Sequence, residues 1–83
     1  MYTTDYINLE MRAQRNGVDM DKFAEAVYDS DQEVLDKFNG ELCENDEYEY
    51  VNQDGSDNAE ANMLHAELLK AKLVELEAEA AEA

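Results

Sequence analysis

The residues best suited to chemistry in this sequence are a single cysteine, Cys43, and a single histidine, His65. A thiol and an imidazole can form a nucleophile and its base, but the base needs a third group to orient it, and no motif supplies one. Two soft ligands are also too few for a structural zinc site, which uses four. We therefore interpret Cys43 as a small apolar filler beside Leu42, and His65 as a surface or flanking residue of a helix.

A turn that contains Asn52, Asp54 and Gly55 is the next place where chemistry is conceivable. If Gly55 takes the sixth position of an EF-hand loop, the first and twelfth positions are Tyr50 and Ala61. Both positions require oxygen ligands, so the calcium motif fails. Carboxylates occur along the whole chain, so no pair stands out as an acid–base couple. The sequence predicts a protein that is not an enzyme and has no cofactor or metal.

Negative charge is the dominant chemical property of the chain. Its 83 residues include 22 Asp and Glu against six Lys and Arg, which gives a formal net charge of −16. Nucleic acids and anionic membrane surfaces are bound through Lys and Arg, so direct binding to either is excluded. A basic protein surface is the natural partner. The alternative is that the charge only confers solubility.

The length allows one domain, residues 1–83. No apolar run approaches the ~18 residues that a membrane span needs. The residues after Met1 are polar, so we expect no signal peptide. A lone cysteine, which cannot form an intramolecular disulfide, fits a reducing compartment. These features predict a cytoplasmic protein.

Hydrophobic periodicity predicts a mainly α fold, a small bundle of about four helices. The first helix runs from Thr3 or Thr4 to about Asn16, where Gly17 ends it. The last begins at Ser56 or Asp57 and extends toward the C-terminus. Its apolar residues follow a 3-4-3-4 spacing over only about two heptads, which favours packing on the protein's own core over a coiled coil. These residues are Ala66, Leu69, Leu73, Leu76 and Ala80.

Residues 19–40 are predicted to form two short helices joined by a tight turn. The first begins at Asp19 or Met20 and ends at about Asp29. Its expected apolar face consists of Met20, Phe23, Ala24, Val27 and Tyr28. Ser30 and Glu33 have the spacing of a capping box, so the second is expected to begin there and to end at about Asn39. The arrangement is similar to a helix-turn-helix, but acidic residues on the second helix would repel phosphate, and we reject DNA binding.

Residues 41–60 form the most acidic stretch and contain no Lys or Arg. From Glu47 to Val51 polar residues alternate with aromatic or apolar ones, which predicts a short strand. A short β-hairpin near residues 42–51 is one interpretation of this stretch. An ordered or mobile loop is the other, because an isolated two-stranded hairpin is marginal unless it packs on helices.

The arrangement of the carboxylates suggests a function. Asp21, Glu25 and Asp29 recur every four residues, which places them about 5–6 Å apart on a helix, close to the spacing of phosphates along one nucleic-acid strand. A surface that is merely soluble would intersperse lysines. We predict two carboxylate rows that bind a partner, with two tyrosines as anchors. The rows are Asp21, Glu25, Asp29, Glu33 and Asp36, and Glu44, Asp46, Glu47, Glu49 and Asp54; the anchors are Tyr48 and Tyr50.

In size, acidity and helical character the chain resembles small acidic phage-encoded proteins that block host defence: DNA-mimic anti-restriction proteins, uracil-DNA glycosylase inhibitors and several anti-CRISPR proteins. The resemblance is one of type, and no functional residue is carried over from these families. It implies a non-enzymatic inhibitor in the host cytoplasm that occupies a nucleic-acid-binding cleft. The alternative is a structural or adaptor protein that assembles through its C-terminal amphipathic helix, as a homodimer through Leu69, Leu73 and Leu76.

Overall fold

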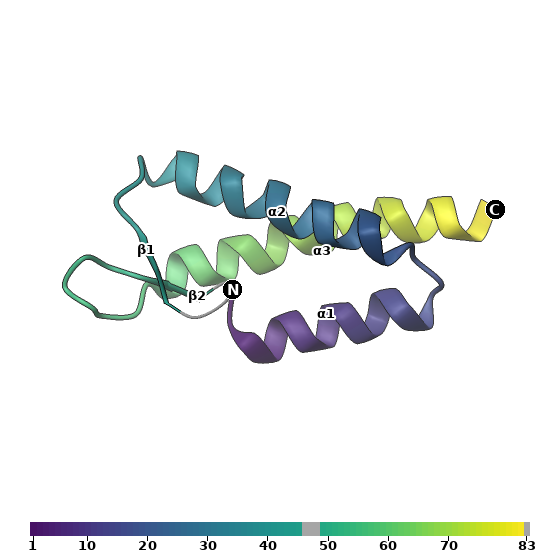
Figure 1. Ribbon diagram of the computed structural model, residues 1–83, viewed down its shortest axis with the longest axis horizontal. Coiled ribbons are helices and arrows are strands. Elements are labelled where there is room, and N and C mark those ends of the chain that lie inside the picture. The colour runs from purple at the N-terminus through teal and green to yellow at the C-terminus, as the bar shows by residue number, and fades with distance from the viewer. Residues whose placement is uncertain (46–48, 83) are drawn as a thin grey trace.

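The structure is a computed structural model that describes residues 1–45 and 49–82. Its elements in chain order are α1 (Thr3–Arg15), α2 (Met20–Lys37), β1 (Cys43–Asn45), β2 (Glu49–Val51) and α3 (Ala59–Glu82). The helices lie side by side along the long axis, with α2 antiparallel to α1 and α3 (Figure 1). The mainly α prediction is confirmed, but the described residues form three helices instead of about four.

α2 is one uninterrupted helix where two short helices were predicted. Ser30, the expected start of the second, is completely buried in its middle. The Ser30 hydroxyl donates to the Ala26 carbonyl at 2.8 Å. Because the hydroxyl bonds to the preceding turn, it does not cap a new helix, and α2 continues. The N-cap of α2 is Asp19, whose carboxylate accepts from the Asp21 N–H at 2.9 Å.

The buried face of α2 differs from the one predicted. Ala24 and Tyr28 were expected in the core, but both are exposed, and Tyr28 retains 62% of its accessible surface. The buried residues are Phe23, Ala26, Val27, Ser30, Asp31 and Val34. Two of these buried residues, Ser30 and Asp31, are polar. A search for apolar periodicity alone could therefore not assign them to the buried face of α2.

Glycines end the first two helices. Gly17 has a φ of 71°, and the Val18 N–H after it donates to the Ala13 carbonyl at 3.0 Å. At the end of α2, Gly40 also has a φ of 71°, and its N–H donates to the Leu35 carbonyl at 3.0 Å. Positive φ is unstrained in glycine, so it can reverse the chain and satisfy the last carbonyls. The predicted end of the first helix is confirmed.

The three helices share one core, and the apolar residues of α3 that follow the 3-4-3-4 spacing belong to it. Its buried members are Met1, Leu9, Ala13, Val18, Phe23, Ala26, Val27, Ala66, Leu69 and Leu73, and Leu76 and Ala80 pack at its edge. The prediction that these α3 residues pack on the protein's own core is confirmed.

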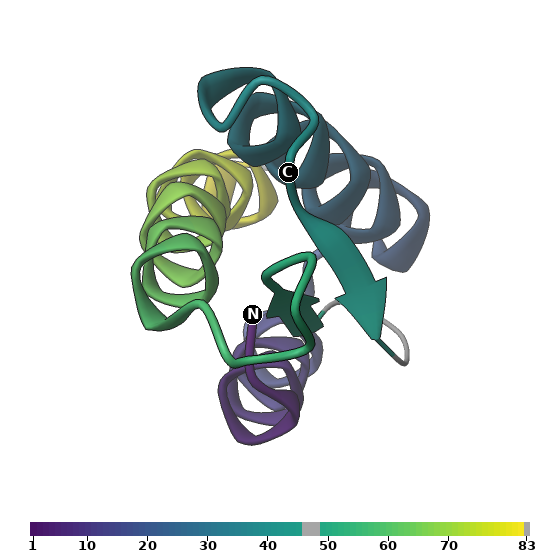
Figure 2. The same cartoon turned by 90° about the vertical axis from the view of Figure 1, so that its left-hand side faces the viewer.

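A β-hairpin packs on the end of the bundle, beside the start of α3 and the end of α2 (Figure 2). β1 and β2 are antiparallel and pair Glu44 with Tyr50, so the hairpin interpretation of this stretch is confirmed. A second core cluster of Val34, Tyr50 and Ala61 holds the hairpin on the helices. Cys43 is exposed, so its predicted filler role is wrong. Its neighbour Leu42 packs against this cluster.

Candidate functional site

The first predicted carboxylate row lies on the solvent face of α2. At 3.6 residues per turn, Asp21, Glu25, Asp29 and Asp36 fall within a sector of ~80° opposite the buried stripe. All four are exposed. In the described part of the chain, none of these four carboxylates forms an ion pair. We call these four residues the acidic stripe.

Glu33, the fifth member of the predicted row, is turned toward α3. Its carboxylate lies 3.7 Å from the Lys72 ammonium group. Lys22 pairs with Glu79 of α3 at 3.6 Å. Both lysines line a shallow groove between α2 and α3 that Glu25 and Asp29 also border. Two lysines that already have carboxylate partners therefore flank the acidic stripe on the side facing α3.

Three carboxylates of the second predicted row, Glu44, Glu49 and Asp54, belong to the residues that the structure describes. Asp46, Glu47 and Tyr48 lie outside the described residues. Asp54 holds the turn before α3, because its carboxylate accepts from the Ser56 hydroxyl at 2.6 Å and from the Ser56 N–H at 2.9 Å, and these bonds lower its pKa.

The two remaining carboxylates of that row, on the paired strands, are less available than predicted. Glu49 is half-buried. Glu44 is exposed as a residue, but desolvation and then hydrogen bonding to Asp31 raise the pKa of its carboxyl to about 7. The described strands thus carry two carboxylates of this row, Glu44 and Glu49.

Tyr50, predicted as an interface anchor, has no exposed surface. Its hydroxyl hydrogen-bonds with the Asp31 carboxyl and lies 3.1 Å from Nδ1 of His65. Desolvation, followed by the bond to Asp31, raises the Tyr50 pKa further above its usual value. A completely buried ring cannot contact a partner, so the anchor prediction is wrong for Tyr50.

His65 was predicted at the surface, but it is completely buried. Its Nε2 lies 3.1 Å from the Val27 carbonyl oxygen. That oxygen can only accept, so Nε2 carries a hydrogen. Desolvation, and then repulsion from the Met1 amino group, lowers the His65 pKa to about 4. His65 is therefore neutral near pH 7, and its Nδ1 is an acceptor.

Asn62 clamps the backbone of Tyr50. Its Oδ1 accepts from the Tyr50 N–H at 2.9 Å and from the Met1 amino group at 2.9 Å. Its Nδ2 lies 3.0 Å from the Tyr50 carbonyl oxygen, 2.9 Å from the Asn58 carbonyl oxygen and 3.1 Å from the Asp57 carboxylate. Burial lowers the Met1 amino pKa to about 6. We call Asp31, Tyr50, Asn62 and His65 the buried polar cluster.

The predicted functional residues did not include Asn62 or His65, although a signal for Asn62 was present. It precedes Ala66, Leu69 and Leu73 in the same 3-4-3-4 spacing that identified the apolar seam. Extending that spacing to polar residues places Asn62 on the buried face. Its partners come from the hairpin, which the spacing cannot reveal.

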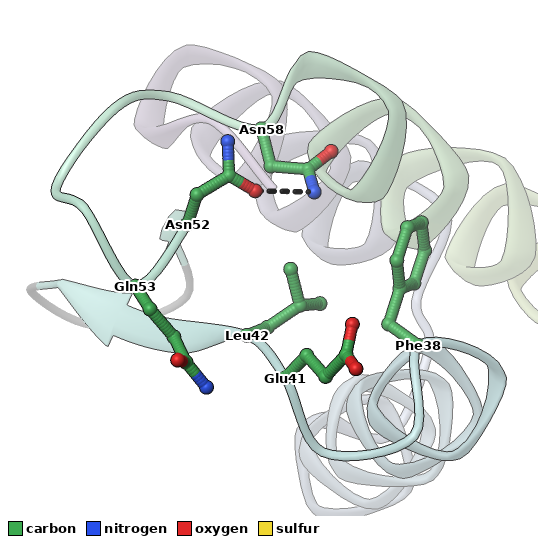
Figure 3. A pocket seen from close by; sticks show the side chains of 6 residues that line it. All are labelled: Phe38, Glu41, Leu42, Asn52, Gln53 and Asn58. Carbon is green, nitrogen blue, oxygen red and sulfur yellow. Dashed lines mark hydrogen bonds between the residues drawn. The ribbon is translucent and has the colours of Figure 1, made fainter.

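Figure 3 shows a hollow at the hairpin end of the bundle, in which Asn52 and Asn58 hydrogen-bond to each other. It measures about 370 Å³ and lies between the end of α2, β1 and the start of α3. It is lined by Phe38, Glu41, Leu42, Asn52, Gln53 and Asn58. Asn58 donates to Asn52 at 3.0 Å and caps α3 by accepting from the Ala61 N–H at 3.0 Å. The cap is thus Asn58, and the prediction of Ser56 or Asp57 is wrong.

A metal site and a Cys43–His65 pair are the other chemical arrangements that residues 1–45 and 49–82 could contain. Within these ranges, no group of three or more His, Cys, Asp and Glu residues is arranged to hold a metal ion. Cys43 is exposed on β1, whereas both ring nitrogens of His65 face Val27 and Tyr50. Among the described residues, none of the helices contains an apolar stretch of the length that a bilayer span requires.

The residues named for a homodimer lie inside the monomer. Leu69 and Leu73 have no exposed surface, and Leu76 is partly buried against the same core. A dimer that used these side chains would have to open the three-helix core.

Comparisons with protein-family models, with curated proteins and with solved structures yield no match to this chain. The function proposed below therefore rests on the chain's own residues.

Proposed function

We propose that the protein is a non-enzymatic inhibitor that binds the basic nucleic-acid cleft of a host-defence nuclease or CRISPR-type complex in the host cytoplasm. The observation that carries this proposal is the acidic stripe of α2. Four exposed carboxylates share one sector of the helix, with no cation among them and no ion-pair partner in the described chain. Such a stripe presents negative charge where a basic cleft expects phosphates.

The geometry of the stripe supports binding to a cationic groove. Residues four apart on a helix are about 5–6 Å apart at Cβ, which approaches the separation of phosphates along a strand. The net charge of −16 adds a long-range field that attracts a basic partner and raises the association rate. Both effects weaken as salt screens the charges.

The aromatic residue expected to contact the partner is Tyr28 instead of Tyr50. Tyr50 is buried, so it is replaced by Tyr28, which is 62% exposed. Tyr28 lies one turn from Glu25 on α2 and borders the acidic stripe. A tyrosine at the edge of a charged surface can pack its ring on an arginine of the partner.

The test compares two variants that remove the same charge from different helices. The α2 variant carries Glu25→Gln, Asp29→Asn and Asp36→Asn. The α3 variant carries Glu60→Gln, Glu67→Gln and Glu82→Gln, all at exposed positions of α3. Each variant loses three carboxylates. Wild type and both variants are immobilised, exposed to host lysate at low and high salt, and eluted with duplex DNA or single-stranded RNA.

We expect wild type and the α3 variant to retain nucleic-acid-binding proteins that DNA or RNA elutes. The α2 variant should retain at least tenfold less. Equal capture by the two variants would show that only net charge matters and would refute the role of the stripe. A salt-insensitive homodimer with no eluted partner would support the adaptor alternative instead.

A further inference from the structure

A second seam runs along the exposed side of α3. Met63 and Val74 each retain 57% of their accessible surface, and Glu67 and Lys70 lie exposed between them. These four positions follow a 4-3-4 spacing, so at 3.6 residues per turn they share a sector of ~60°. α3 therefore has the residue spacing of a coiled coil on a face that α1 and α2 leave exposed. We call these four residues the exposed seam.

The exposed seam borders a groove of about 380 Å³ between α1 and α3. Leu9 and Met11 contribute apolar lining from α1, and Met11 retains 55% of its accessible surface. α2 lies on the other side of the bundle (Figure 2), so the acidic stripe faces away from this groove. A helix that packs on the exposed seam would therefore contact α1 as well as α3.

Half of the basic residues of this acidic chain line the same groove. Of the six Lys and Arg, Arg12, Arg15 and Lys70 are found there, together with Asp5. Arg12 is bonded to Glu77. Arg15 and Lys70 form no ion pair within residues 1–45 and 49–82. Cations without carboxylate partners, next to exposed apolar side chains, are complementary to an occupant that is both acidic and apolar.

The exposed seam is complementary to itself when two copies of α3 run antiparallel. Met63 and Val74 lie equally far from the midpoint of the seam, and so do Glu67 and Lys70. A two-fold axis at that midpoint places Met63 opposite Val74 of the second copy. It also places Glu67 opposite Lys70 of the second copy, and each contact occurs twice. A parallel pair would oppose like charges at both polar positions, which costs free energy.

We infer that a second copy of this chain packs its α3 antiparallel into the groove between α1 and α3, and so forms a symmetric dimer. Each chain supplies both the carboxylate of Glu67 and the ammonium group of Lys70, so the charges match without a third molecule. The contact is short, because Met63 and Val74 are ~16 Å apart along the helix. Two chains of net charge −16 also repel each other. We therefore expect a weak dimer, with a Kd of about 10–100 µM.

This dimer goes beyond the proposed function and does not depend on it. Because α2 lies away from the groove, both acidic stripes of the dimer stay exposed (Figure 2). The α3 variant, which contains Glu67→Gln, weakens the dimer but leaves the acidic stripe unchanged. A monomer that captures a partner overturns the dimer alone, and a dimer that captures none overturns the proposed function alone.

The experiment reverses and then exchanges the two charges of the exposed seam. Glu67→Lys and Lys70→Glu each replace two attractive contacts of the dimer with two repulsive ones. The double variant, Glu67→Lys with Lys70→Glu, restores both attractive contacts and has the net charge of wild type. Lys37→Glu is the matched control for Lys70→Glu, because Lys37 is exposed in the last turn of α2. Sedimentation equilibrium at about 0.15 M salt, where the Debye length is about 8 Å, measures Kd.

We expect each single reversal to raise Kd at least tenfold. The double variant should return to within about threefold of wild type, and Lys37→Glu should differ from wild type by less than about threefold. Glu67→Lys is especially informative, because it reduces the net negative charge and would strengthen a dimer governed by net charge alone. A wild type that stays monomeric up to about 1 mM protein would overturn the inference and favour a different protein as the occupant of the groove. A double variant no tighter than the singles would also overturn it.

Cross-linking tests the antiparallel orientation in a Cys43→Ser background. Chains with Met63→Cys and chains with Val74→Cys are oxidised separately and as a mixture. We expect the disulfide-linked dimer in the mixture, because a disulfide needs Cβ atoms about 3.5–4.5 Å apart and the two positions are opposite each other. Rapid linking within either single variant would overturn the orientation. Both positions are exposed, so this result decides the question even if a charge variant unfolds.

Discussion

Nδ1 of His65 lies 3.1 Å from the hydroxyl oxygen of Tyr50, and this contact joins α3 to the hairpin. The same hydroxyl bonds to Asp31 of α2. Residues from three parts of the chain therefore meet at one oxygen atom. Buried polar groups that lose their partners cost free energy, so this oxygen is a sensitive point for the stability of the hairpin end.

Replacing Tyr50 with Phe tests that contact. The ring still fills the core, but Nδ1 of His65 and the Asp31 carboxyl lose their common partner. We expect the free energy of unfolding to fall by about 1–3 kcal/mol, measured by urea denaturation at pH 7. Tyr28→Phe is the control, because Tyr28 is 62% exposed, and should change stability by less than about 0.5 kcal/mol. Equal changes in the free energy of unfolding for Tyr50→Phe and Tyr28→Phe would mean that the Tyr50 hydroxyl contributes nothing to stability.

The sequence predicts the helical elements well where apolar spacing and glycines agree. The first helix, its end at Gly17 and the core role of Leu69 and Leu73 were all predictable. The predicted helix break at Ser30 does not occur, since α2 is continuous there. The prediction was wrong because a capping-box serine and a buried serine that bonds to the preceding turn have the same sequence pattern. Which of the two forms depends on the tertiary environment, and Ser30 faces the core.

Asn62→Ala should be among the most destabilising single changes in the chain. The amide of Asn62 satisfies both the N–H and the carbonyl of buried Tyr50. Alanine leaves the Tyr50 N–H without its Asn62 partner, at a cost of about 1–3 kcal/mol, whereas the Tyr50 carbonyl keeps its bond from the Asn58 N–H at 3.3 Å. Asn8→Ala, at an exposed position of α1, is the control. In thermal unfolding, the melting temperature should fall strongly for Asn62→Ala and little for Asn8→Ala. A similar small decrease for both variants would contradict the role of Asn62 in holding the Tyr50 backbone.

The ion pair between α1 and α3 gives a pH-dependent prediction. Arg12 donates to Glu77 through Nε at 2.9 Å and Nη2 at 2.6 Å, which lowers the Glu77 pKa. The stabilisation is therefore present above the carboxyl's ordinary value near 4.5 and is lost as pH falls below it. The pair is partly exposed, so we expect Glu77→Gln to cost at most about 1 kcal/mol at pH 7.

The difference between Glu77→Gln and wild type should shrink toward zero as the pH drops to about 3, because protonation then removes the pair in wild type. Glu75→Gln removes an exposed carboxylate from the same helix and should show no such convergence. A constant difference across this range would mean that packing, and not charge, accounts for the effect of Glu77.

The candidate site was predictable only in part, for a physical reason. Positions on one helix face follow from the 3.6-residue repeat, and the acidic stripe of Asp21, Glu25, Asp29 and Asp36 is found where that repeat puts it. Burial of Tyr50 depends on how the hairpin packs, and a strand of alternating residues has two faces that the sequence alone does not distinguish. The structure assigns the Tyr50 face to the core.

The acidic stripe should also leave a trace in stability. Glu25 and Asp29 are neighbours at i, i+4, and each also lies four residues from another acid, Asp21 or Glu33. Like charges at this spacing each cost a helix about 0.2–0.5 kcal/mol. The α2 variant, with Glu25→Gln, Asp29→Asn and Asp36→Asn, should therefore be more stable than wild type by about 1 kcal/mol at low salt, and the gain should decrease as salt is added.

The α3 variant is the control for this effect as well, because Glu60 and Glu67 are not four residues apart and their removal relieves less repulsion. Urea denaturation at low and high salt measures both variants. If the α2 variant is more stable than wild type and no longer binds the partner, the carboxylates of the acidic stripe serve binding and lower the free energy of unfolding. If the α2 variant were less stable than wild type, the stripe would have a structural role, and its loss of binding could not be attributed to charge mimicry.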